Sequence, residues 1–182
     1  MKKRIPSKSS NFASLIEENS YFVDKSAFIT KLESINDKYI FFLRPRRFGK
    51  SLTLSMLEYY YGIQHKERFD KLLGQYYIGK PENTTPLRNS YHILTFNFSG
   101  IETDNRDQII SSFILRLVNG ISQFNKDYGI LTSSDLDEIC SVKTASGVLT
   151  GFVTKLKQRG FNEKIYLLID EYDHFTNELF SF

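Results

Sequence analysis

The feature that most constrains the fold is an apolar run that leads through a short basic loop into a helical pattern. Residues 38–43 include the apolar series Tyr39-Ile40-Phe41-Phe42-Leu43, which is typical of a buried strand. The following loop, residues 44–51, ends in Gly49-Lys50-Ser51, and residues 50–61 have the pattern of a helix. A loop that enters a helix points several backbone N–H groups at one place, where the helix dipole also favours negative charge. The segment therefore predicts an anion-binding loop within an α/β fold.

The residue types of this loop are those of a P-loop, or Walker A element, at 44–51. Gly49 allows the backbone to close around a phosphate, and Lys50 supplies a mobile positive charge for the β- and γ-phosphates of a nucleotide. The Ser51 hydroxyl is suited to ligate Mg²⁺. We therefore expect ATP and Mg²⁺ as cofactors and Lys50 as a catalytic cation. The expected nucleotide-binding residues are Arg47, Phe48, Gly49, Lys50, Ser51 and Leu52.

A second segment supplies acids at the end of another apolar run. Residues 165–171, Ile-Tyr-Leu-Leu-Ile-Asp-Glu, resemble a Walker B element in which Asp170 and Glu171 follow a buried strand. Ligands of open α/β sheets bind beyond the carboxyl ends of the strands, so Asp170 is expected at the same rim as the loop. Asp170 then holds Mg²⁺ together with Ser51. Glu171 is placed to orient or deprotonate an attacking water.

Each signal also has a simpler structural explanation. A Gly-Lys-Ser/Thr tripeptide occurs by chance in roughly one chain in ten of this length, so the tripeptide alone is weak. Its place between an apolar strand and a helix, with Asp-Glu downstream, makes it specific. A fortuitous turn beside a buried strand is the alternative for the loop. For Glu171 the alternative is a solvated carboxylate at a strand end.

The rest of the chain alternates between helical and strand patterns. This alternation, without a hairpin signal, predicts an α/β fold with a parallel sheet in a three-layer αβα arrangement of the P-loop NTPase type. A helical lead-in at 1–37 is expected before a P-loop core at 38–182. The other expected elements are helices within 12–34 and at 66–73, 105–125, 134–140 and 144–159, and strands at 91–98 and 164–169.

Three blocks of the sequence resemble a bacterial family of AAA-ATPase-like proteins. The blocks are Arg44-Pro45-Arg46-Arg47-Phe48-Gly49-Lys50-Ser51, Tyr21-Phe22-Val23-Asp24-Lys25-Ser26 and Leu168-Ile169-Asp170-Glu171-Tyr172-Asp173. The resemblance extends over nearly the whole chain. It implies an additional-strand P-loop core that uses ATP and Mg²⁺. It also implies a downstream nuclease-like domain of the PD-(D/E)XK type as a partner in full-length members.

The sequence departs from the general P-loop pattern in two places. Arg44 occupies the position of the first glycine, and Pro45 favours an extended backbone at Arg44, so the loop opens with a different turn. The chain stops at Phe182, soon after the Walker B element, where sensor residues and arginine fingers normally follow. We therefore expect a C-terminally incomplete core, an ATPase in the full-length protein and slow or absent hydrolysis in this chain. A nucleotide-sensing switch without turnover is the alternative.

Charge and composition bear on the partners. The net charge of +3 is small, but residues 1–60 carry 11 Lys and Arg against 6 Asp and Glu. This local excess suits an anionic ligand, and a nucleic-acid-associated module that grips a phosphate backbone is a further alternative. The lone Cys140, the lack of a signal-peptide pattern and the lack of a long apolar run favour a cytoplasmic protein without membrane segments.

Other residues have more than one possible role. Arg46 and Arg47 either touch phosphate, act in a neighbour's site or remain solvated charges of the loop. Asp24-Lys25 either lies near the adenine, braces the loop, or forms a structural ion pair or cap. The aromatic run Tyr59-Tyr60-Tyr61 is expected to pack in the core rather than to stack on bases.

Overall fold

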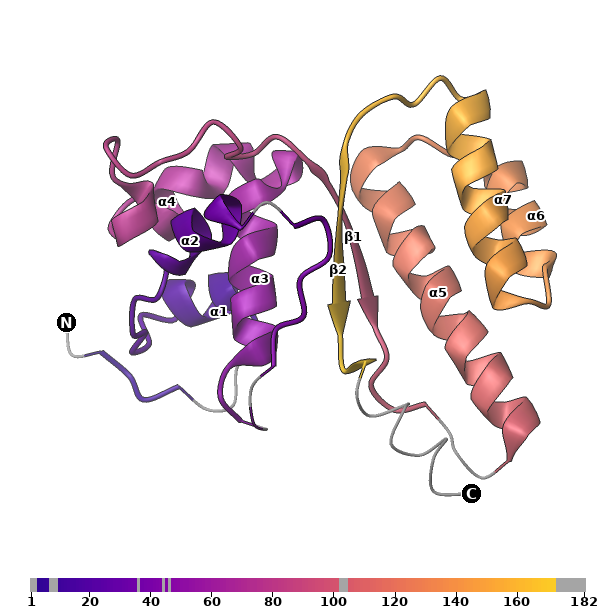
Figure 1. The fold of residues 1–182 in the computed structure, drawn as a ribbon, viewed down its shortest axis with the longest axis horizontal. Helices are drawn as coiled ribbons and strands as arrows, with labels where there is room; N and C mark the ends of the chain where they lie inside the picture. The colour runs from indigo at the N-terminus through magenta and orange to yellow at the C-terminus, as the bar shows by residue number, and fades with distance from the viewer. Residues whose placement is uncertain are drawn as a thin grey trace. The chain divides into compact units, whose positions relative to one another are not determined.

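The computed structural model describes residues 3–6, 10–35, 37–43, 45, 47–101 and 105–172 (Figure 1). The chain divides into two compact units, which we name unit 1 (residues 1–91) and unit 2 (residues 92–182). Within the described ranges, every helix is too short or too polar to cross a membrane.

Unit 1 is built from helices. These are α1 (Phe12–Glu17), α2 (Phe28–Ser34), α3 (Lys50–Tyr61), the 3₁₀ helix η1 (Ile63–Arg68), α4 (Phe69–Leu73) and the short 3₁₀ helix η2 (Tyr77–Gly79). Their apolar sides form a core that includes Phe12, Ile29, Tyr60 and Leu73, each fully buried. The predicted helices at 50–61 and within 12–34 are thus confirmed. The short helix expected at 66–73 is also present, as α4 and the end of η1.

The predicted strand at 38–43 is wrong. In the described part of the chain the sheet has two strands, and neither of them lies in this segment. Tyr39, Phe41 and Leu43 are 85%, 75% and 79% exposed, and Phe42 packs on Phe28 with their ring centroids 5.4 Å apart. An apolar run becomes a strand only where a neighbouring strand completes its ladder of hydrogen bonds. The local pattern at 38–43 carries no information about such a neighbour.

Unit 2 contains the sheet. Strand β1 (His92–Asn97) is followed by three helices, α5 (Arg106–Tyr128), α6 (Ser133–Ser141) and α7 (Ala145–Gln158), and then by strand β2 (Ile165–Asp170). The two strands pair in parallel, with His92 opposite Ile165 and Asn97 opposite Asp170. The prediction of an α/β fold with parallel strands joined through helices is confirmed for this small sheet.

Helix α5 lies close against β1 because of one glycine. A Cβ atom added to Gly120 would lie 2.5 Å from the ring of Phe96 and 2.6 Å from the carbonyl oxygen of Thr95. Only glycine allows this approach of helix and strand. The contact joins Leu94 and Phe96 to a core with α5, α6 and α7 residues such as Leu117, Ile139 and Phe152.

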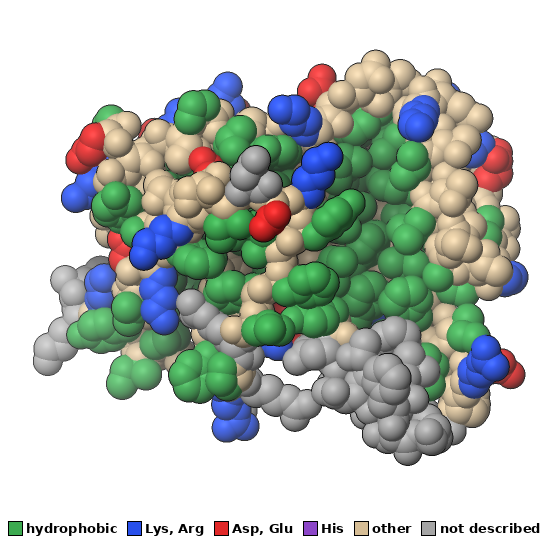
Figure 2. All heavy atoms as spheres, in the orientation of Figure 1, with side chains coloured by type: hydrophobic (Ala, Val, Ile, Leu, Met, Phe, Trp, Pro, Cys, Tyr) green, Lys and Arg blue, Asp and Glu red, His purple; other side chains and the backbone are tan. Residues whose placement is uncertain are grey.

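On one face of the sheet, the helices cover the side chains of β1 more fully than those of β2. Paired residues of a parallel ladder share a face, so Leu167 lies beside Leu94, and Ile169 lies beside Phe96. Leu94 and Phe96 are buried, but Leu167 and Ile169 are 49% and 38% exposed. Figure 2 shows hydrophobic side chains gathered over the part of unit 2 between β2 and α7. Strand β2 therefore keeps an apolar surface despite its position next to a helical layer.

Candidate functional site

The loop before α3 turns sharply through two left-handed residues. The N–H of Phe48 donates to the carbonyl oxygen of Pro45 across 3.3 Å, which closes a tight turn. Arg47 has φ +68°, and Gly49 has φ +77° and ψ +30°. Two left-handed residues so close together curve the backbone directly ahead of the helix, in the way that anion-binding loops are built. Arg44 and Arg46 lie outside the described residues.

The first turn of α3 has no side-chain cap. The first N–H groups of any helix lack an acceptor within the helix, and Gly49 at the N-cap has no side chain to supply one. Among the helices of the described residues, α1, α5, α6 and α7 are capped by a side-chain oxygen, from Asn11, Asn105, Thr132 and Thr144, whereas α2 and α4, like α3, are not. The N-cap residue of α3 thus supplies no side-chain acceptor, which suits a helix start that binds an anion.

The hydroxyl groups of Ser51 and Thr53, in the first turn of α3, differ in their hydrogen bonding. The Thr53 hydroxyl donates to the carbonyl oxygen of Gly49 across 2.9 Å, so it is part of the helix start. Among the described residues, the Ser51 hydroxyl makes no hydrogen bond. Lys50 and Ser51 are both partly buried. The Ser51 hydroxyl, the group that the sequence predicts as a Mg²⁺ ligand, is therefore not used by the described part of the fold.

Helix α3 is fixed firmly within unit 1, which gives the loop a rigid base. The N–H of Phe12 donates to the Ser55 hydroxyl across 3.0 Å, and the Tyr61 hydroxyl donates to Glu33 across 3.0 Å. Tyr60 and Tyr61 are almost completely buried. The expected core role of the aromatic run Tyr59-Tyr60-Tyr61 is confirmed. A site built on such an element keeps its geometry better than one on a free loop.

Asp24 has a structural role. Its carboxylate accepts the N–H of Ser26 and the N–H of Tyr77, each across 2.8 Å. The buried Ser26 hydroxyl in turn accepts the N–H of Ile78 across 3.1 Å. Burial acts to raise the pKa of Asp24, but the hydrogen bonds from Ser26 and Tyr77 outweigh it and lower the pKa below its ordinary value. Asp24 is therefore a cap that ties two segments of unit 1, which is one of the roles that the sequence predicts for it.

The acids of the second motif lie at the carboxyl end of β2, in unit 2. Asp170 is the last residue of the strand, and its carboxylate accepts the N–H of Glu171 across 3.0 Å. Both residues are partly buried. Glu171 has φ +57°, a left-handed conformation that a glutamate rarely adopts. The strand therefore ends in a sharp turn that changes the backbone direction between the two acids.

Asn97 is a polar residue at this sheet edge that no local sequence pattern indicates. It is the residue of β1 directly opposite Asp170. The carbonyl oxygen of Asp170 also accepts the N–H of Phe98 across 3.1 Å, which holds the two strand ends together. The Asn97 side-chain oxygen accepts the N–H of Ser99 across 2.9 Å. The signal that would have revealed it is topological, since parallel strands bring their carboxyl ends to one edge.

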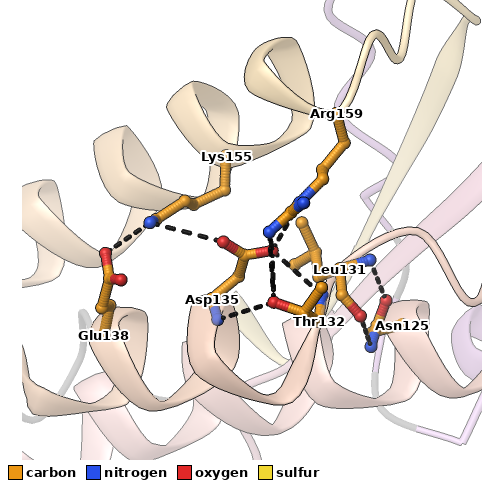
Figure 3. A network of polar contacts seen from close by, with 7 residues as sticks. All are labelled: Asn125, Leu131, Thr132, Asp135, Glu138, Lys155 and Arg159. Carbon is orange, nitrogen blue, oxygen red and sulfur yellow. Dashed lines mark hydrogen bonds and ion pairs between the residues drawn. The ribbon is translucent and has the colours of Figure 1, made fainter.

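Asp135 is another buried acid, and it stabilises the fold instead of forming part of a candidate site (Figure 3). Asp135, in the first turn of α6, accepts the N–H and the hydroxyl of Thr132 across 3.0 and 2.8 Å. It also accepts Arg159 Nε across 2.7 Å and lies 3.3 Å from Lys155 Nζ. The Thr132 backbone hydrogen bond, with the Thr132 hydroxyl, Arg159 and Lys155, holds the pKa of Asp135 far below its ordinary value, although burial opposes this. All its partners are structural, so this shift marks a helix-cap network.

Comparison with known proteins connects this chain to a protein family. A family model described as "Predicted AAA-ATPase" matches residues 6–182. No curated protein and no solved structure matches the chain. The matched range includes the loop before α3 and the acids at the end of β2.

Proposed function

Because this chain belongs to the predicted AAA-ATPase family, we propose that it binds ATP with Mg²⁺ through the loop before α3. The backbone N–H groups of Arg47, Phe48, Gly49, Lys50, Ser51 and Leu52 surround the β- and γ-phosphates in this proposal. Lys50 adds the positive charge between them. The observation that carries the proposal is the left-handed backbone of Gly49, the N-cap residue of α3, which provides no side-chain cap. Lys50 and Ser51 follow it directly.

Ser51 is proposed as a ligand of Mg²⁺, and Asp170 stays the second ligand that the sequence predicts. Ser51 and Asp170 supply a hydroxyl and a carboxylate, which are the oxygen ligands that Mg²⁺ prefers. The Ser51 hydroxyl, unused by the described part of the fold, supports this assignment. Asn97 lies next to Asp170 in the ladder and is suited to orient its carboxylate. Bound Mg²⁺ would neutralise part of the phosphate charge.

The same proposal includes the three-layer architecture of P-loop NTPases. In that architecture a parallel sheet lies between two layers of helices. The parallel pairing of β1 with β2, and the close packing of α5 on β1 through Gly120, support it. The downstream nuclease-like domain stays a prediction that the family resemblance suggests.

We further propose that Glu171 orients the attacking water in a full-length ATPase. Its left-handed backbone directs the chain away from the strand immediately after Asp170. In a protein that continues beyond residue 182, Glu171→Gln should retain ATP affinity and lower phosphate release by about 100-fold, because positioned acid–base groups contribute roughly that much. Phosphate release at the wild-type rate would exclude this role. If the wild-type protein binds ATP but releases no phosphate, the nucleotide-sensing switch is the better account.

Calorimetric titration of ATP into this chain tests the binding proposal. We expect binding of one ATP in the presence of Mg²⁺ and at least about tenfold weaker binding when Mg²⁺ is removed with EDTA. Raising the salt from about 50 to about 200 mM should change the ATP affinity only a few-fold. A module that grips a nucleic-acid backbone would instead lose about 10³-fold or more in affinity for an oligonucleotide over this range. Absence of ATP binding, combined with such an oligonucleotide response, would favour that alternative.

A further inference from the structure

Left-handed backbone conformations at non-glycine residues are few and unevenly distributed. Within the described residues, they occur at Asn19, Arg47, Asn89 and Glu171. Asparagine tolerates this region well, because its short side chain bonds locally to the backbone. Arginine and glutamate have no such advantage. The two unfavourable cases, Arg47 and Glu171, each lie within one of the two motifs of the proposed site.

Arg47 occupies a position at which glycine would fit with less strain. It lies immediately before Phe48 in the turn that the Phe48 N–H closes on Pro45. The third residue of such a turn is usually glycine when its φ is positive, since a Cβ atom is unfavourable there. A long charged residue at this position therefore costs stability.

Within the described part of the chain, no contact of the Arg47 side chain compensates for this cost in stability. Arg47 is exposed, and within the described part of the chain its guanidinium makes no ion pair, hydrogen bond or ring contact. By contrast, Arg68 pairs with Glu17 and Arg159 pairs with Asp135. Strained residues that contribute no fold contact are candidates for a functional role.

We propose that Arg47 is the residue that makes the site prefer a nucleoside triphosphate to a diphosphate. The inference rests on the proposed function, because it needs the phosphates to lie at the loop. The guanidinium is a planar fork that binds two oxygens of one phosphate, and Lys50 provides only a point charge. Mg²⁺ and Lys50 together offset the charge of a diphosphate, and a triphosphate leaves roughly one negative charge over for Arg47.

Three variants of the whole chain separate this role from simpler ones. Arg47→Gly removes both the strain and the charge, and Arg47→Lys keeps the charge without the fork. Asn19→Gly is the matched control, because Asn19 has φ +51°, is exposed and lies outside the loop. For each variant, calorimetry gives the affinities for Mg²⁺–ATP and Mg²⁺–ADP, and thermal unfolding without nucleotide gives the midpoint.

Arg47→Gly should weaken ATP binding by about 10- to 100-fold and ADP binding by less than about threefold, as expected for one lost charge-assisted contact to the last phosphate. Its unfolding midpoint should stay the same or rise by about 1–3 °C, since relief of strain offsets the extra entropy of glycine in the unfolded chain. Arg47→Lys should recover only part of the preference for ATP. Asn19→Gly should bind both nucleotides as the wild type does.

Three outcomes would overturn the inference. An unchanged ATP-to-ADP preference in Arg47→Gly would show that the side chain takes no part in recognition. Full recovery by Arg47→Lys would show that Arg47 acts only through its general positive potential. A clearly lower midpoint in Arg47→Gly would show that the residue holds the loop together. If the wild type and Asn19→Gly bind neither nucleotide, the proposed function itself fails and the role of Arg47 falls with it.

Discussion

Asp135→Asn is expected to lower the thermal unfolding midpoint of unit 2 by roughly 10 °C at neutral pH. The wild-type carboxylate is 3% exposed and is bound by Thr132, Lys155 and Arg159 (Figure 3). The amide keeps the shape but removes the negative charge between two cations. It also weakens the capping box at the start of α6. Differential scanning calorimetry measures the change.

The control for this variant is Asp137→Asn. Asp137 lies in the same helix but is exposed, so its change should leave the midpoint within a few degrees of the wild-type value. Equal midpoints for the two variants would mean that the Asp135 network does not stabilise unit 2.

Low pH should remove the difference in thermal unfolding midpoint between the wild type and Asp135→Asn. The pKa of Asp135 is lower in the folded protein than its ordinary value of 3.8, so its stabilising effect is complete well above pH 3.8. As the pH falls below that value, the unfolded chain takes up the proton first and the folded state loses its advantage. Midpoints measured from pH 7 to pH 3 should therefore converge. A difference that stays constant over this range would contradict the assigned charge interactions.

Local sequence patterns were sufficient for most helices and for the two paired strands. The apolar stripe of residues 50–61, the Thr132 capping signal and the continuous apolar run before Asp170 are all encoded within a few residues of each other. The parallel pairing of β1 with β2 also follows from the helices between them. Such features need no knowledge of distant partners.

Features that depend on distant partners could not be predicted. Glu33 accepts hydrogen bonds from Tyr61 and Thr85, which are 28 and 52 positions away. No spacing in the sequence indicates these contacts. The strand prediction for residues 38–43 fails for the same reason, since the apolar residues of this segment specify a strand only if another strand lies beside them. The position of Asn97 opposite Asp170 required the register of the sheet.

Lys50→Ala is expected to abolish ATP binding, with an affinity loss of at least about 100-fold. Lys50 is the first residue of α3, directly after the left-handed Gly49. Its ammonium adds a full charge to a place where the helix dipole and the backbone N–H groups already favour an anion. Loss of a charged hydrogen bond to phosphate costs roughly 1.5–3 kcal/mol, and the alanine also leaves the phosphate charge poorly compensated.

Lys66→Ala is the matched control. Lys66 lies in η1 of the same unit and is exposed, so its removal changes the net charge equally without touching the loop. Both variants should unfold at the wild-type midpoint within a few degrees, which shows that any loss of binding is local.

Calorimetric titration of Mg²⁺–ATP into the wild type, Lys50→Ala and Lys66→Ala is the most direct test of the claim that this loop binds a nucleotide. The wild type and Lys66→Ala should bind one ATP with similar affinity, and Lys50→Ala should give no measurable heat of binding. Equal ATP affinity in all three proteins would contradict the assignment of residues 47–52 as the nucleotide-binding loop.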